Sequence, residues 1–343
     1  MDIYSPVTQL KAIKQMRPID MFLQTVFLEE GYAIPQEKAV WDTKKGKTRM
    51  APFVGRNVGG VITSREGYDT KSITFTNIAP ERPVTMDDVA GRMFGENFVS
   101  DMTPEQRAMM LMAEDLMEMR QEIASRKEWM VSQILFGGKF DLLEYVDGGL
   151  LKKSLDYVDF GFTQEYTPDV PWGDTGSNII ADMEAMAKMV REGQGSVEII
   201  IMASDVKAAM YLDEAYLKIL DNRRFNSGLI APAFAGQSLL YIGVNHLGTP
   251  MYEYDGTVID HNGNVVKLVP DGKMLMGGKK LLKSVYGPVT QIEVPNGPMR
   301  TYLEREVPLR YSETGGTAIK QRLTSRPIVM PFNVDGWVVG DVL

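Results

Sequence analysis

Residues that could perform catalysis are scarce in this sequence. It contains no cysteine and only two histidines, His246 and His261. The lack of cysteine excludes disulfides, thiolate metal sites and cysteine nucleophiles. Neither histidine has a serine nearby in the strand-turn-helix pattern that hydrolases use. His246 ends an apolar run and His261 lies at a polar turn, so we interpret both as structural and expect no catalytic triad.

Two patterns that could bind a phosphate or a metal ion fail on their spacing. A phosphate-binding loop needs glycine, four residues, and then Gly-Lys-Ser/Thr, but the segment 273–280 has lysine at its first and last positions. Acidic pairs occur at Glu29-Glu30 and Asp87-Asp88. No further ligands follow them at the spacing of a calcium loop. We therefore interpret them as solvated or capping carboxylates, and expect no metal and no cofactor.

Composition and charge set loose limits on function. The 343 residues are enough for two domains, and 44% apolar with 24% charged residues is ordinary for a globular chain. A net charge of -8 argues against nucleic-acid binding through an overall positive field. No segment approaches the roughly 20 consecutive apolar residues of a membrane span. The first residues also lack a secretory signal pattern, so we expect a protein made and used in the cytosol.

One long helix, over residues 104–136, is the element around which the other segments are expected to assemble. Thr103 suits its N-cap, Pro104 its first position, and Gly137-Gly138 its end. Its length predicts a rod of roughly 50 Å, about three times the usual helix. One side of it is apolar and carries Met109, Met112, Leu116, Met119, Ile123, Met130 and Ile134. Such a rod predicts an extended protein with this helix as its spine.

The residues before this spine helix predict an arm and a long hairpin. Residues 1–46 contain short amphipathic helices, and residues 47–85 alternate between polar and apolar side chains around a wide, glycine-bearing tip. An isolated two-stranded hairpin is weak in water, so we expect a neighbouring subunit to cover its apolar face. The apolar residues expected at inter-subunit contacts are Phe22, Phe27, Phe53, Ile73 and Phe75.

The residues after the spine helix predict an α+β domain and a set of returning strands. Residues 151–299 form the axial domain, with a helix at 178–191 and a buried strand at 197–202. Residues 300–343 are expected to return to the spine and to form a peripheral domain together with residues 86–150. A strand there would present Glu304, Arg305 and Glu306 to a charged partner. The expected fold class is α+β, with an arm, an extended two-stranded loop, a spine helix and a central α+β domain.

Several short motifs occur in a fixed order along the chain. They are Phe22-Leu23 with Phe27 and Glu29; Ala51-Pro52-Phe53-Val54 with Gly60 and Val61; Arg65-Glu66-Gly67 with Phe75-Thr76 and Pro83; Pro270-Asp271 with Met274 and Gly277; and Ser325-Arg326-Pro327-Ile328 with Asp335 and Val338. In this order, and over essentially its full length, the sequence resembles the lambda-type major capsid protein E family of tailed bacteriophages. The fold of those proteins is the Hong Kong 97-like fold.

This resemblance implies a structural subunit and not an enzyme. Copies would self-assemble into pentamers and hexamers that form an icosahedral head, assembled in the host bacterial cytoplasm and located in the virion. Double-stranded DNA would be held by confinement without sequence-specific binding. A separate scaffolding protein and a portal are implied as partners, and a decoration protein is left open. Lys71 and Asn333 are available for a covalent cross-link, but nothing in the sequence places them together and none is expected.

Two other functions are left open by the sequence. One is a cellular nanocompartment shell of the same fold. The other is an enzyme with an extended flap, which would need a pocket converging on His246 or His261 with carboxylates nearby. For an assembling shell, we expect the substitution Phe75→Asp to leave the central domain folded and to block assembly.

Overall fold

The computed structural model describes most of the chain. The described residues are 13, 21–43, 69–91, 103–146, 151–213, 216–218, 238–260, 262–292, 297–312 and 318–343. The first arm helix that we expected, the hairpin tip with Phe53, and His261 lie outside these residues. Among the helices of the described part, none is long and apolar enough to cross a membrane.

The described chain contains both helices and strands, with most strands in the second half. The helices are α2 (Phe22–Phe27), α3 (Met86–Ala90), α4 (Pro104–Gly137), α5 (Ile179–Glu192) and α6 (Ser204–Met210). The strands of the first half are β1 (Leu28–Ala33), β2 (Lys38–Thr43), β3 (Asp69–Thr74), β4 (Glu81–Thr85), β5 (Lys139–Val146), β6 (Leu151–Asp159) and β7 (Glu165–Tyr166). Those of the second half are β8 (Ile199–Met202), β9 (Leu239–Val244), β10 (Pro250–Tyr254), β11 (Thr257–Ile259), β12 (Val265–Lys267), β13 (Lys273–Gly277), β14 (Leu282–Tyr286), β15 (Val289–Ile292), β16 (Met299–Tyr302), β17 (Val307–Ser312), β18 (Ala318–Thr324), β19 (Pro327–Pro331) and β20 (Trp337–Asp341).

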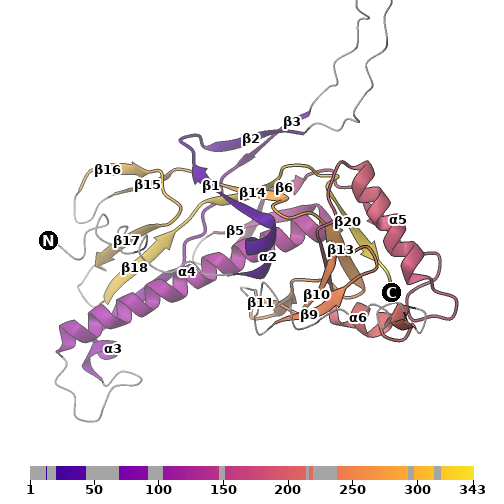
Figure 1. Ribbon diagram of the computed structural model, residues 1–343. Helices are drawn as coiled ribbons and strands as arrows, with labels where there is room; N and C mark the ends of the chain where they lie inside the picture. Colours follow the sequence, from indigo (N-terminus) through magenta and orange to yellow (C-terminus); the bar gives the residue numbers. More distant parts are fainter. Residues whose placement is uncertain are drawn as a thin grey trace, which may run out of the picture.

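The spine helix α4 has the ends that its sequence predicts. Thr103 and Gln106 form a reciprocal capping box, in which each side chain bonds the backbone N–H of the other residue. At the other end, Gly138 adopts a φ of 64°, and its N–H donates to the carbonyl of Ile134 over 2.9 Å. The 34 residues between these caps give a rod of about 50 Å, which crosses the molecule in Figure 1. The prediction of this helix is confirmed.

Two parts of α4 pack into different hydrophobic cores. Leu116, Met119 and Ile123, near its middle, form a small cluster with Ile13 and Leu323. In its second half, the side chains that join the large core are Met130, Val131, Ile134, Leu135 and Phe136. Strands β4 and β18 contact α4, as do β13 and β19. The helix therefore connects two separately packed regions, which explains why so long a helix is stable.

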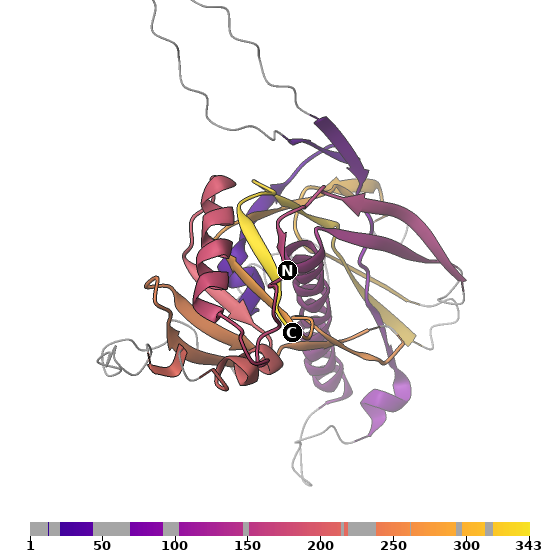
Figure 2. The ribbon, with the colours of Figure 1, turned by 90° about the vertical axis from the view of Figure 1, so that its right-hand side faces the viewer.

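The large core is built around a mixed six-stranded sheet in the order β7-β20-β13-β8-β10-β9. Helix α5 covers one face of it, because a Cβ on Gly340 of β20 would lie 2.9 Å from the side chain of Met186 of α5. The other face meets α4, since the indole of Trp337 donates a hydrogen bond to the carbonyl of Leu135 over 2.8 Å. Figures 1 and 2 show this sheet with α5 on its outer side and α4 beside it. The expected α+β domain is therefore present.

The C-terminal strands divide between the spine and this central sheet. Strands β17 and β18 join β4 in one three-stranded sheet, and β19 joins β14 and β1 in another. The final strand β20, in contrast, pairs with β13 and β7 in the six-stranded sheet. We expected all of residues 300–343 to belong to the peripheral domain of the spine, but β20 is part of the central six-stranded sheet, where Trp337 bonds the end of the spine. The residues Trp337 to Gly340 of β20 are all buried, and a strand buried on both faces belongs inside a sheet.

The long hairpin is paired at its root, nearer the arm than we expected. Strand β2 pairs antiparallel with β3, from Lys38↔Thr74 to Thr43↔Asp69. Strand β4, which we placed within the hairpin of residues 47–85, instead pairs with β18 beside the spine. The root lies at the upper edge of the body in Figure 1. The domain boundaries as a whole remain a prediction.

Candidate functional site

Of the groups considered for catalysis and metal binding, Asp88 has a capping role in the structure. No group of three or more histidine, aspartate or glutamate side chains that could hold a metal ion occurs among the described residues. His246 lies 3.7 Å from the carboxylate of Glu184, which is mostly exposed. Asp88 forms a capping box with Thr85 at the start of α3. Hydrogen bonds from Thr85 lower the pKa of Asp88, as expected of a capping carboxylate.

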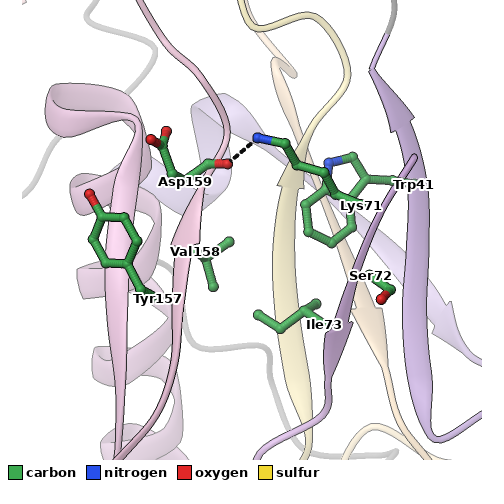
Figure 3. Close-up of a pocket in the computed structure, with 7 residues that line it drawn as sticks. All are labelled: Trp41, Lys71, Ser72, Ile73, Tyr157, Val158 and Asp159. Carbon is green, nitrogen blue, oxygen red and sulfur yellow. Dashed lines mark hydrogen bonds between the residues drawn. The ribbon is translucent and has the colours of Figure 1, made fainter. Parts of the chain in front are cut away.

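A groove of about 340 Å³ separates the hairpin root from strand β6. Figure 3 shows Ile73 of β3 and Val158 of β6 pointing toward each other across it. Above them, the ammonium of Lys71 donates a hydrogen bond to the carbonyl of Asp159 over 2.5 Å. Ile73 and Val158 are both almost completely buried. The groove therefore lies where the hairpin root packs on the body. The contact consists of the apolar side chains of Ile73 and Val158 and of the hydrogen bond from Lys71.

Aromatic side chains extend this contact from the hairpin root toward the end of the spine helix. The ring of Trp41 lies 5.3 Å from that of Phe160, and the ring of Phe140 lies 6.3 Å from Phe160. The backbone N–H of Phe160 donates to the carbonyl of Gly138, the residue that ends α4, over 3.0 Å. Aromatic pairs at such distances stabilise by about 0.5–1.5 kcal/mol beyond their buried area. The direction of the hairpin root is thus set by the last turn of the spine.

Arg326 joins both ends of the hairpin root to strand β19. Its guanidinium donates to the carboxylate of Glu37, just before β2, over 3.0 Å. It also donates to the carbonyl of Phe75, just after β3, over 2.8 Å. A single cation therefore holds the two points where the hairpin leaves and rejoins the body. Sequence reasoning missed this role, because nothing near Arg326 in the sequence indicates partners about 250 residues earlier.

Three of the residues expected at inter-subunit contacts are buried within the chain. Ile73, Phe75 and Phe27 are 2%, 3% and 0% exposed and belong to the large core. The ring of Phe75 packs so closely on Gly287 that a Cβ there would lie 2.5 Å from it. We assumed that the hairpin and the arm lack apolar cover from their own chain. For these three side chains that assumption is wrong, because the body itself covers them.

The other residues expected at inter-subunit contacts differ in their surroundings. Phe22 is half-buried, with its ring 4.9 Å from that of Tyr254. Residues 304–306 form a bend between β16 and β17, and not the strand that we expected. Arg305 donates to the carbonyl of Gly31 over 2.9 Å, and Glu306 pairs with Arg120 of the spine at 2.8 Å. Arg305 and Glu306 therefore bind their own chain.

A cluster of charges holds strand β4 to the first half of the spine. Arg82 donates to the carboxylates of Glu118 and of Glu122, the latter over 2.9 Å. It also contacts Asp115 at 3.3 Å. Burial raises the pKa of Asp115, and Arg82 opposes that rise. The three carboxylates lie at spacings of three and four residues, which places them on one side of the helix.

The sequence matches the family model described as phage major capsid protein E over residues 5–342. This is nearly the whole chain. The chain belongs to the phage major capsid protein E family. No curated protein sequence matches the chain. Members of this family are structural proteins of the capsid and not enzymes.

The fold of the chain is similar to those of several solved structures. The capsid protein is similar to a prophage protein of E. coli CFT073 assigned to the capsid, with 15% identity, a TM-score of 0.68, and 99% of each chain covered. It is also similar to a phage-related protein of Bordetella bronchiseptica RB50, with 9% identity and a TM-score of 0.49 over 99% of this chain and 98% of that one. A third similar chain comes from Mycobacterium phage Che8, with 11% identity and a TM-score of 0.45 over 89% and 85%. The capsid protein has the Hong Kong 97-like fold.

The surface of this capsid protein carries exposed apolar side chains that sequence reasoning did not select. On the hairpin root, Val40 is 56% exposed, on the face opposite Trp41 and Ile73. Strand partners in two further hairpins are exposed as well: Ile259 with Val265, and Ile292 with Met299. Alternation along a strand puts successive residues on opposite faces but does not tell which face the body covers. These exposed side chains are the better candidates for contacts between subunits.

Proposed function

We propose that this capsid protein is the shell subunit of a phage head. Copies self-assemble into pentamers and hexamers, which form a closed icosahedral shell around double-stranded DNA. The observation that carries the proposal is the match to the phage major capsid protein E family over residues 5–342. Nothing favours a cellular nanocompartment over a phage head for this chain.

The charge of the chain supports a container that does not bind its contents. A net charge of -8 gives no overall attraction to phosphate, and nucleic-acid affinity depends on many lysine and arginine contacts. DNA would then be retained by confinement, with no sequence-specific contact. A wall that binds DNA weakly also allows the DNA to leave.

The partners and location follow from this role. A separate scaffolding protein and a portal are the expected partners, and a decoration protein is a further candidate. Assembly would take place in the host bacterial cytoplasm and the product would be the virion. Within each subunit, residues 151–299 would meet other copies around the capsomer axis, and the hairpin that starts with β2 and ends with β3 would reach a neighbour.

Sedimentation velocity of the purified chain, with electron microscopy of the fastest fraction, tests the proposal. Rings of five and six subunits, or closed shells, are expected. A compact monomer that persists at high concentration, both alone and with a co-expressed scaffolding protein, would contradict it.

A substitution on the outer face of the hairpin root tests where subunits meet. Val40→Asp places a charge on a side chain that is already 56% exposed, so the subunit should fold normally while assembly falls. Val40→Thr is the matched control, because threonine keeps the branched shape and the strand preference without the charge. Assembly of the Val40→Asp variant at the parent's yield would exclude this face as a contact.

A further inference from the structure

A buried carboxylate on the spine helix holds the beginning of arm helix α2. Glu128 is 0% exposed. Its two oxygens accept hydrogen bonds from the backbone N–H groups of Leu23, over 2.8 Å, and Gln24, over 3.0 Å. Helix α2 has no side-chain cap of its own at Met21. Glu128 therefore supplies, from about 100 residues away, the acceptors that the first turn of a helix needs.

The neighbouring residue of the spine holds the other end of the same arm segment. Lys127 donates to the carboxylate of Glu30 in β1 over 2.8 Å and to the hydroxyl of Tyr286 over 3.2 Å. Glu30 also accepts hydrogen bonds from Tyr286, over 2.6 Å, and from Ser284, over 3.1 Å. Two adjacent spine residues thus bind the arm at both ends of the segment from Phe22 to Ala33.

Glu128 is also in contact with the central sheet. The hydroxyl of Tyr254, in β10, donates to Glu128 Oε1 over 3.2 Å. This is the oxygen that accepts the N–H of Leu23. Burial raises the pKa of Glu128 even though four hydrogen-bonding groups oppose the rise. Burying this carboxylate therefore costs free energy. Its oxygens keep these hydrogen-bond donors only while both the arm and β10 remain in place.

We propose that Glu128 is a positioning residue that couples arm helix α2 (Phe22–Phe27) to strand β10, so that displacement of β10 from the spine frees this helix. Strand β1, which follows α2, stays in place because it pairs with β14 and because Lys127 binds Glu30. The side chains of Leu23 and Phe27, which are 0% exposed, would reach solvent only after this release. The inference concerns one subunit and holds or fails independently of the proposed shell.

Hydrogen exchange followed by mass spectrometry tests this coupling in the full-length chain, in the assembly state in which it purifies. In Glu128→Gln, one oxygen becomes an N–H₂ group that cannot accept a hydrogen bond. Amides of Phe22–Phe27 should then exchange at least about tenfold faster, while those of Ile199–Met202 in β8 keep their rates. Glu122→Gln, on the exposed side of the same helix, is the control and should leave both segments unchanged.

A second variant separates coupling from simple loss of stability. Tyr254→Phe removes only the hydroxyl and keeps the ring packed on Phe22. Faster exchange in α2 with unchanged exchange in β8 supports the coupling. Unchanged exchange of α2 in Tyr254→Phe would overturn it. Equal acceleration in α2 and sheet, in either variant, would overturn it too, because it would mean that Glu128 only stabilises the whole fold.

Discussion

Replacing Phe75 by alanine distinguishes a core residue from a contact residue. Phe75 is 3% exposed, and its ring fills the space beside Gly287 at the base of the hairpin. The structure places it in the core, so removing the ring should destabilise the unassembled subunit. A residue that only contacts a neighbouring subunit would leave that stability unchanged and lower assembly alone.

The expected loss for Phe75→Ala is about 3–5 kcal/mol in the free energy of unfolding. The glycine beside the ring cannot extend to fill the cavity, which argues for the upper part of this range. A loss of this size is a large part of the roughly 5–15 kcal/mol that a typical domain has. The earlier expectation, that Phe75→Asp leaves the central domain folded and blocks assembly, is therefore not compatible with the burial of Phe75 in the large core.

Urea denaturation of the unassembled chain, followed by tryptophan fluorescence, measures this loss. Val40→Thr is the matched control, since Val40 lies on the exposed face of the same hairpin and should change stability by less than about 0.5 kcal/mol. If Phe75→Ala also changed the unfolding free energy by less than about 0.5 kcal/mol, the core assignment would be refuted. Phe75 would then again be a candidate for contact with a neighbouring subunit.

Three other changes give separate tests. Burial alone would raise the pKa of Glu30, but its contacts, chiefly Lys127, lower the pKa below the ordinary value of 4.5. The ionised Glu30 therefore stabilises the folded state above pH 4.5, and this stabilisation is lost as the pH falls through the lowered pKa. Unfolding measured from about pH 6 to about pH 3 should depend less on pH in Glu30→Gln than in the parent. Gly31→Ala would put a Cβ 1.9 Å from a backbone carbonyl of β14. Thermal unfolding should show a loss of about 1–3 kcal/mol in stability. Gly137→Ala is the control, because a Cβ there meets open space, and it should leave stability unchanged or slightly raise it. Arg82→Met removes a partly exposed cation and should cost about 1 kcal/mol at low salt, with less difference from the parent in 1 M salt; an equal loss at both salt concentrations would argue against the ion pairs.

The sequence alone determined the elements whose signals are local. The caps at Thr103 and Gly138 and the absence of glycine or proline between residues 105 and 136 are sufficient to predict α4, because caps and propensity act within a few residues. The same holds for α5, where Ile179, Met183, Met186 and Val190 were expected to face inward and are buried. The family could also be identified from the sequence, because the order of short motifs can be read without knowing any tertiary contact.

Tertiary structure decided which side of each element is covered and which distant groups meet. Alternation in the hairpin separates Ile73 and Phe75 from their neighbours, yet both faces of a two-stranded ribbon look alike until the body packs on one of them. The sequence gives no sign that Arg326 binds the hairpin root, or that Glu128 caps a helix about 100 residues earlier. A buried charge is tolerated only where donors from other elements converge on it. That convergence is a property of the folded chain and not of any single segment.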